Sequence, residues 1–131
     1  MFVVEKDGRI RTANEGILPG TIRNIIVEEC KRENIPIDMS PPVRHMCFTC
    51  SQYHTHTHTV LLQTHIQLIS EMMDSWDAVF LTSTSRLVLE VDEIRGDHQS
   101  KVFRGSHPVV RDVERMVLES LGRRSRAISR V

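Results

Sequence analysis

The stretch Gly16-Ile17-Leu18-Pro19-Gly20-Thr21-Ile22-Arg23 decides the fold that this sequence predicts. Two glycines and a proline mark a loop, and apolar residues then recur every three or four positions from Ile22 to Cys30. This period predicts a helix that begins at Gly20-Thr21 and buries one face. The unpaired backbone N–H groups and the positive dipole end of such a helix start favour a bound phosphate, although a Gly-Thr pair is also an ordinary helix cap.

A second polar turn follows the apolar run of Ala78-Val79-Phe80-Leu81-Thr82-Ser83-Thr84-Ser85. The first half predicts a buried strand, and the second half offers hydroxyl groups and backbone donors where that strand ends. This combination can form an anion-binding nest, although a cluster of Ser and Thr after a strand is also a common plain turn.

The remaining elements form a mixed α/β pattern. Asp7-Gly8 predicts a hairpin between strands at 2–4 and 9–12, and the proline in Ile35-Pro36-Ile37-Asp38 predicts an edge strand. A short helix is expected over 71–76, and strands over 78–81, 87–91 and 101–103. The turn Gly105-Ser106-His107-Pro108-Val109-Val110-Arg111 predicts the start of the last helix, which should end at Gly122 and leave 122–131 as a frayed tail.

Three motifs in this order resemble the class IV aminotransferase family, which includes branched-chain aminotransferases, D-amino-acid aminotransferases and aminodeoxychorismate lyases. Residues 16–23 and 78–85 are similar to the family's two phosphate-binding segments, and 105–111 to the turn that opens its final helix. The match covers 2–43 and 70–121. The resemblance implies that 1–131 form the C-terminal pseudobarrel domain of a fold type IV enzyme, an α/β domain with an irregular segment inserted at 44–69. The resemblance also implies that the intact protein is a homodimer.

Carried to this sequence residue by residue, the resemblance implies a pyridoxal 5′-phosphate site. The cofactor-binding residues that it implies are Leu18, Gly20, Thr21, Ile22, Ser83, Thr84 and Ser85.

Each of these positions has an implied role. Leu18 packs against the pyridine ring, Thr21 and Ile22 present backbone N–H groups to the phosphate, and Thr84 supplies a hydroxyl. Most members read Gly-Ile-Thr-Arg where this chain reads Thr before Ile, so that one hydroxyl is displaced. Arg86 is a candidate for binding a substrate carboxylate through a bidentate contact, with a surface arginine as the alternative.

The resemblance also implies that the catalytic groups are missing from residues 1–131. In the family, the lysine that bonds the cofactor and the carboxylate that pairs with the pyridine nitrogen precede the strand that matches 2–4. None of Lys6, Lys31 and Lys101 corresponds to that lysine, and all three are expected to be exposed. We therefore expect no catalytic residue here, and amino-acid or 2-oxo-acid substrates only for the intact protein.

Residues 44–69 differ in composition from the rest of the chain. The stretch contains Cys47, Cys50 and alternating Thr and His at 54–59, but no Asp or Glu. Two cysteines and two histidines suit zinc, yet the spacing fits no standard zinc finger, so we expect no metal site. A retained intron is the preferred origin, because a repeated CA dinucleotide encodes alternating His and Thr; a lineage-specific loop is the alternative. The rival function is a non-catalytic interaction or metal-binding module at 44–69.

Composition excludes several other classes. Seventeen basic and seventeen acidic residues leave no net charge, which argues against nucleic acid as a partner. The apolar runs are too short to cross a bilayer, and no signal peptide is visible at 1–7. An odd number of cysteines favours free thiols in a reducing compartment, without identifying that compartment.

Overall fold

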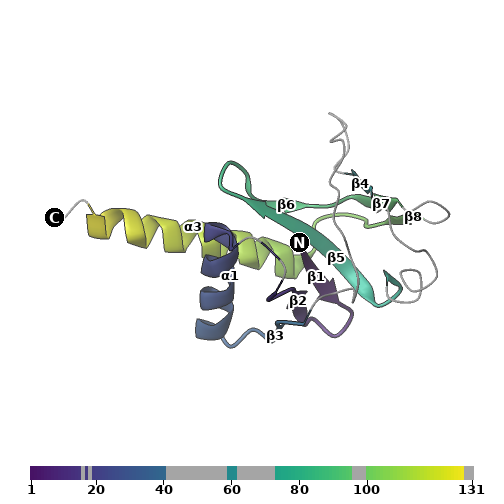
Figure 1. The fold of residues 1–131 in the computed structure, drawn as a ribbon, viewed down its shortest axis with the longest axis horizontal. Helices are drawn as coiled ribbons and strands as arrows, with labels where there is room; N and C mark the ends of the chain where they lie inside the picture. The colour runs from purple at the N-terminus through teal and green to yellow at the C-terminus, as the bar shows by residue number, and fades with distance from the viewer. Residues whose placement is uncertain (16, 18, 41–58, 62–72, 96–99, 129–131) are drawn as a thin grey trace.

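The computed structural model describes residues 1–15, 17, 19–40, 59–61, 73–95 and 100–128. Within them, ten helices and strands form a five-stranded sheet, a three-stranded sheet and a pair of crossed helices (Figure 1). The elements are β1 (Phe2–Glu5), β2 (Ile10–Thr12), α1 (Thr21–Arg32), β3 (Ile37–Asp38), β4 (Thr59–Leu61), β5 (Trp76–Ser83), β6 (Leu87–Glu90), β7 (Glu93–Arg95), β8 (Ser100–Val102) and α3 (Pro108–Ile128).

The five-stranded sheet has the order β3-β2-β1-β5-β6. The hairpin of β1 and β2 confirms the prediction from Asp7-Gly8, and Gly8 adopts a positive φ of 83° that its turn requires. Strand β1 also pairs antiparallel with β5, in a register that places Phe2 opposite Phe80. The edge strand predicted around Pro36 is confirmed as β3, which pairs parallel with β2.

The core lies on both faces of this sheet. Phe2, Phe80 and the buried face of α1 belong to one cluster, which the buried face of α3 completes. The two phenylalanine rings stack with their centroids 4.8 Å apart. Val3 and Val79 point to the opposite face and pack in a second cluster with Phe103. The alternation of side chains along each strand therefore places the helices on one face and β7 on the other.

The three-stranded sheet corrects two expectations. Its order is β4-β7-β8, and β4 lies inside the segment 44–69, which was predicted to be irregular throughout. Thr59–Leu61 pairs parallel with Glu93–Arg95. Strand β7 was not predicted at all, since its three residues are too few to show a period. The rest of 44–69 lies outside the described residues.

Two helix boundaries also differ from the predictions. Helix α3 begins at Pro108 as expected, but continues through Gly122 to Ile128, so the predicted end at Gly122 is wrong. A glycine costs about 1 kcal/mol inside a helix, which the packing of α3 evidently outweighs. The short helix predicted to reach Trp76 is wrong at its end, because Trp76 is already the first residue of β5.

The predicted mixed α/β class is confirmed, because both a mixed sheet and helices are present. The two sheets are separate in the described residues, and closure into a pseudobarrel stays a prediction. Neither α1 nor α3, the two helices described, combines the length and the apolar composition needed to cross a membrane.

Candidate functional site

The first turn of α1 offers free backbone donors to a ligand. Gly20 is the helix cap, with extended backbone angles and no side-chain hydrogen bond to the turn. Its carbonyl accepts the N–H of Asn24 at 3.0 Å, so the N–H groups of the three residues between them have no partner in the helix. No acidic side chain occupies the first turn. The helix start therefore keeps its capacity for an anion.

Three side chains of this turn have different surroundings. Thr21 is exposed, and its hydroxyl makes no hydrogen bond within the described part of the chain. Ile22 is 5% exposed and packs in the core, so only its backbone can contact a ligand. Arg23 donates from Nη2 to the carbonyl of Ala13 at 2.5 Å. Arg23 thus holds the loop before the helix.

The second turn connects β5 to β6. The Ser83 hydroxyl accepts the N–H of Arg86 at 3.1 Å and lies 3.3 Å from the hydroxyl of Ser85, so both serines stabilise the turn itself. Thr84 is exposed, and its hydroxyl has no hydrogen bond to a described residue. Leu87 follows with a φ of 57°, a conformation that is strained for a branched side chain. Thr84 is therefore the hydroxyl that this turn leaves available.

A shared core links the two turns. Ile22 and Phe80 belong to the same buried cluster, and Leu87 packs against it. In Figure 1 the first turn of α1 and the β5–β6 hairpin lie toward the same end of the molecule. No hydrogen bond joins Thr21 to Thr84, so the structure brings the predicted segments onto one core without a direct contact between their hydroxyls. Leu18 lies outside the described residues.

Arg86 presents a charged group beside this turn. The side chain is exposed and forms no ion pair with a described residue. A guanidinium without a partner retains its full capacity for a carboxylate. The position is compatible with the predicted substrate contact and equally with a surface arginine.

The third motif positions the start of α3. Gly105 has a φ of 74°, which favours glycine, and Pro108 begins the helix. The backbone N–H of His107 donates to Glu90 Oε1 at 2.8 Å, and the N–H of Val109 donates to His107 Nδ1 at 3.3 Å. The end of β6 therefore fixes the place where α3 begins.

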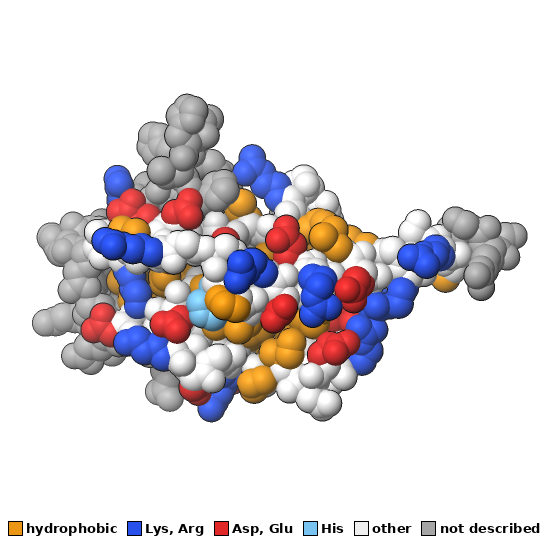
Figure 2. All heavy atoms as spheres, turned by 180° about the vertical axis from the view of Figure 1, so that it is seen from behind, with side chains coloured by type: hydrophobic (Ala, Val, Ile, Leu, Met, Phe, Trp, Pro, Cys, Tyr) orange, Lys and Arg blue, Asp and Glu red, His pale blue; other side chains and the backbone are white. Residues whose placement is uncertain are grey.

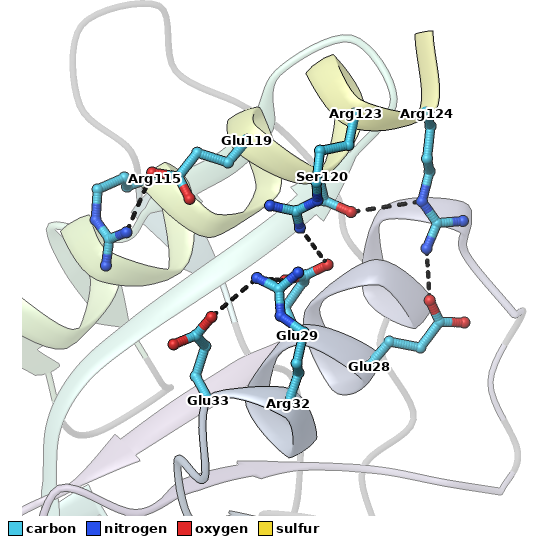
Figure 3. A network of polar contacts seen from close by, with 9 residues as sticks. All are labelled: Glu28, Glu29, Arg32, Glu33, Arg115, Glu119, Ser120, Arg123 and Arg124. Atoms are coloured by element: carbon cyan, nitrogen blue, oxygen red, sulfur yellow. Dashed lines mark hydrogen bonds and ion pairs between the residues drawn. The ribbon is translucent and has the colours of Figure 1, made fainter. Parts of the chain in front are cut away.

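A set of ion pairs holds α1 against α3 (Figure 3). Glu29 is buried, with a side chain 7% exposed, and its Oε1 accepts from Arg123 Nη2 at 2.9 Å. Its Oε2 lies 2.5 Å from Arg32 Nη2. Burial acts to raise the pKa of Glu29, but the Ser120 hydroxyl and the two arginines outweigh it and hold that pKa below its ordinary value. The ion pairs favour ionised Glu29 and so fix the direction of α1.

The lysines lie away from the two turns. The expectation that all three are exposed is wrong for Lys101, which is half-buried and donates from Nζ to the carbonyls of Met73 and Trp76. Burial, together with the charge of Lys6, lowers the pKa of Lys101. Trp76 begins β5 and Thr84 follows its end, so eight strand residues separate Lys101 from the turn by about 25 Å. Figure 1 likewise places β8 at the opposite end from the β5–β6 hairpin.

Lys6 and Lys31 are similarly distant. The backbone N–H of Lys6 bonds to the carbonyl of Ser75, just before β5, so Lys6 shares the end of the sheet with Lys101. Lys31 lies in the last turn of α1, about 15 Å along the helix from Thr21. None of the three amines reaches the region of the two turns.

Cysteine and metal chemistry receive little support from the described residues. Cys30 is a free, buried thiol, and burial, followed by the charge of Glu29, raises its pKa to about 11. Among the residues that the structure describes, no three His, Cys, Asp or Glu side chains are grouped so as to hold a metal ion. The other two cysteines and the histidines at 54–58 lie outside those residues.

Comparison with known proteins reveals a structural likeness. The chain is similar to a protein assigned as a 4-amino-4-deoxychorismate lyase from Legionella pneumophila, with a TM-score of 0.60 and 18% identity over 90% of this chain and 33% of that one. It is also similar to a protein assigned as a branched-chain amino acid aminotransferase from Thermotoga maritima, with a TM-score of 0.54 and 24% identity over 89% of this chain and 34% of that one. No protein-family model and no curated protein matches the sequence.

The likeness shows the fold. Both assignments fall within the family that the three sequence motifs resemble, and the matched region covers nearly all of this chain. The chain spans about a third of the length of either solved structure.

Proposed function

We propose that residues 1–131 form the phosphate-binding part of a pyridoxal-phosphate-dependent class IV aminotransferase or lyase. The observation that carries this proposal is the first turn of α1, which has no side-chain cap. This turn shares one buried core with the turn between β5 and β6, which contains Ser83, Thr84 and Ser85. The fold likeness to an assigned lyase and an assigned aminotransferase supports it. Substrates of such an enzyme are amino acids and 2-oxo acids, and the intact protein would be a homodimer.

The residues present fit a phosphate ester. The N–H groups of Thr21 and Ile22 have no partner in the helix, and Thr84 has a free hydroxyl. Ser83 and Ser85 hold the turn in shape, and Leu18 would pack against the ring. When bound, pyridoxal phosphate supplies the electron sink for reactions at the α-carbon of an amino acid. The residues described here would bind and orient its phosphate.

Arg86 would receive the substrate carboxylate. Its guanidinium is exposed, has no ion-pair partner among the described residues and follows Ser85 directly. We propose no catalytic role for any residue of 1–131, since the three lysines lie away from the two turns.

The test is stabilisation by inorganic phosphate. For a dissociation constant of about 1 mM, 10 mM phosphate should stabilise the chain by about 1.4 kcal/mol. Thr84→Val should remove most of this gain. Thr82→Val is the matched control, because it makes the same chemical change within β5, and should leave the gain intact. Equal gains in wild type and Thr84→Val would contradict the convergence of the two turns on one phosphate.

A second stabilisation measurement tests the contact between Arg86 and the substrate. In the presence of phosphate, 2-oxoglutarate should add stabilisation that Arg86→Ala abolishes without changing the response to phosphate alone. An unchanged response to 2-oxoglutarate would assign Arg86 to the surface while leaving the phosphate site intact.

A further inference from the structure

Leu87 packs on the face of the sheet opposite to the one that regular alternation assigns to it. Val79 and Leu81 of β5 face the core cluster on the β7 side, and Ser83 continues that alternation. Leu87 lies directly opposite Ser83 in the register of β5 and β6, so an extended Leu87 would face the same side. Its side chain packs instead against the cluster that contains the buried faces of α1 and α3, as does that of Val88. Two successive residues of β6 therefore point toward the helices.

The backbone of Leu87 explains this reversal. Its φ is 57°, whereas the extended residues of a strand have a negative φ. A left-handed residue is common at the end of a hairpin loop, where glycine usually supplies it because glycine has no Cβ to crowd the backbone. Here a leucine occupies that position, directly after the loop 84–86. The conformation costs free energy that a glycine would save, and only a side chain can pack against the core in return.

This packing attaches the turn between β5 and β6 to the start of α1. The Ser83 hydroxyl accepts the N–H of Arg86, so the loop that contains Thr84 is closed on itself and ends at Leu87. Ile22 belongs to the cluster against which Leu87 packs, and the N–H of Ile22 has no partner in the helix. A shift of Leu87 on the core would therefore move the hydroxyl of Thr84 relative to the N–H of Ile22.

We propose that Leu87 is a positioning residue for the phosphate site. The inference rests on the proposed function, because it assumes that the first turn of α1 and Thr84 bind one phosphate. Leu87 does not itself contact the phosphate; it acts through Thr84, whose distance from α1 it fixes. Groups that converge on one ligand must be held to within about 0.5 Å, and an exposed loop gains that precision only from an anchor in the core.

Truncation of Leu87 separates the stability of the chain from its affinity for phosphate. Leu87→Gly removes the packing and the backbone strain together, whereas Leu87→Ala removes most of the packing alone. The glycine variant should therefore melt at a higher temperature than the alanine variant. Both should bind inorganic phosphate about tenfold more weakly than the wild type, because neither anchors the turn. Melting temperatures across a phosphate titration measure the stability and the dissociation constant of each variant.

Leu87→Met is the conservative variant. Methionine keeps a long apolar side chain that can pack against the same cluster, so this variant should bind phosphate within about twofold of the wild type. Circular dichroism establishes that each variant is folded. If the glycine variant does not fold, the alanine variant tests the same loss of affinity.

Val88→Ala is the matched control. Val88 packs against the same cluster from the next position but has no positive φ and lies outside the turn. The control should lower the melting temperature and leave the affinity for phosphate unchanged. Figure 2 shows basic and acidic side chains interspersed over one face, so the described residues of that face form no wholly basic surface that would compete for phosphate.

The outcomes distinguish this inference from the proposed function. If Thr84→Val loses the response to phosphate while Leu87→Gly keeps wild-type affinity, the positioning role is wrong and the phosphate site stands. An equal loss of affinity in Val88→Ala also overturns the role of Leu87, because any loss of packing would then have the same effect. A wild-type chain that phosphate does not stabilise contradicts both proposals.

Discussion

Glu29 illustrates at the residue scale how a buried charge depends on its partners. Its carboxylate contacts Arg32 and Arg123, and both contacts stabilise the ionised form. A buried carboxylate without such contacts would be protonated more readily than in water. The ion pairs therefore determine the protonation state of Glu29, where α1 and α3 meet.

The folded-state pKa of Glu29 lies below its ordinary value of 4.5. The folded chain thus binds this proton more weakly than the unfolded chain, and stability from Glu29 is present above pH 4.5 and lost as the pH falls through the folded-state pKa. We expect Glu29→Gln to lower the free energy of unfolding at pH 7. The variant should also lose less of that free energy than the wild type between roughly pH 5 and pH 3, where Glu29 becomes protonated. Urea denaturation at each pH measures this. Glu114→Gln, an exposed control, should preserve the wild-type dependence.

A second residue-scale prediction concerns Asn34, which has a φ of 56° just after α1. The N–H of Ile35 bonds back to the carbonyl of Cys30, as in a left-handed helix cap. Asn34→Ala should cost about 1 kcal/mol, since a Cβ without local hydrogen bonding disfavours this conformation. Asn34→Gly should equal or exceed the wild type in thermal denaturation. An alanine variant as stable as the glycine variant would contradict the role of the backbone.

At the scale of elements, the sequence predicts what depends on neighbours along the chain. The start of α1 at Thr21, the Asp7-Gly8 hairpin and the start of α3 at Pro108 were correct because cap, turn and period are local. Strands β4 and β7 are three residues each and exist only through their pairing, which no local pattern reveals. The surroundings of Lys101 also depend on Met73 and Trp76, far from it in sequence.

The predicted end of α3 was wrong because Gly122 was interpreted as a residue that terminates the helix, from its neighbours in sequence alone. Its helical position supports a different expectation: Gly122→Ala should stabilise the chain by about 0.5–1 kcal/mol, because alanine loses less backbone entropy. A Cβ there would meet no atom within 4 Å, so no clash offsets the gain. Thermal denaturation measures the effect. A destabilised variant would show that the helix is not continuous at this position.

For the molecule as a whole, the position of each lysine limits what the chain can catalyse. We expect that residues 1–131 alone do not catalyse amino transfer. The amines of Lys6, Lys31 and Lys101 lie away from the first turn of α1 and from the turn between β5 and β6. Treatment with pyridoxal phosphate and borohydride, followed by peptide mapping, should label lysines substoichiometrically. Lys101 should react in preference to Lys31, because its pKa is lowered by burial. Stoichiometric labelling of one lysine, together with turnover of an amino donor, would contradict this expectation.

The site could be predicted only in outline. The sequence identified both turns, and the structure attaches them to one core through Ile22, Phe80 and Leu87. It did not indicate that the Ser83 hydroxyl already accepts the N–H of Arg86, because this contact depends on the conformation of the turn. The roles of Thr21, Thr84 and Arg86 toward a ligand remain predictions.

The pairing of β1 with β5 has a consequence for synthesis of the chain on the ribosome. Residues 6–75 must be translated between these two strands, which takes about 4–14 s at 5–20 residues per second. Throughout that time Phe2, Val3 and Val4, all fully buried in the finished fold, lack the strand that covers them. A strand that is buried in the finished fold is therefore translated several seconds before the strand that pairs with it.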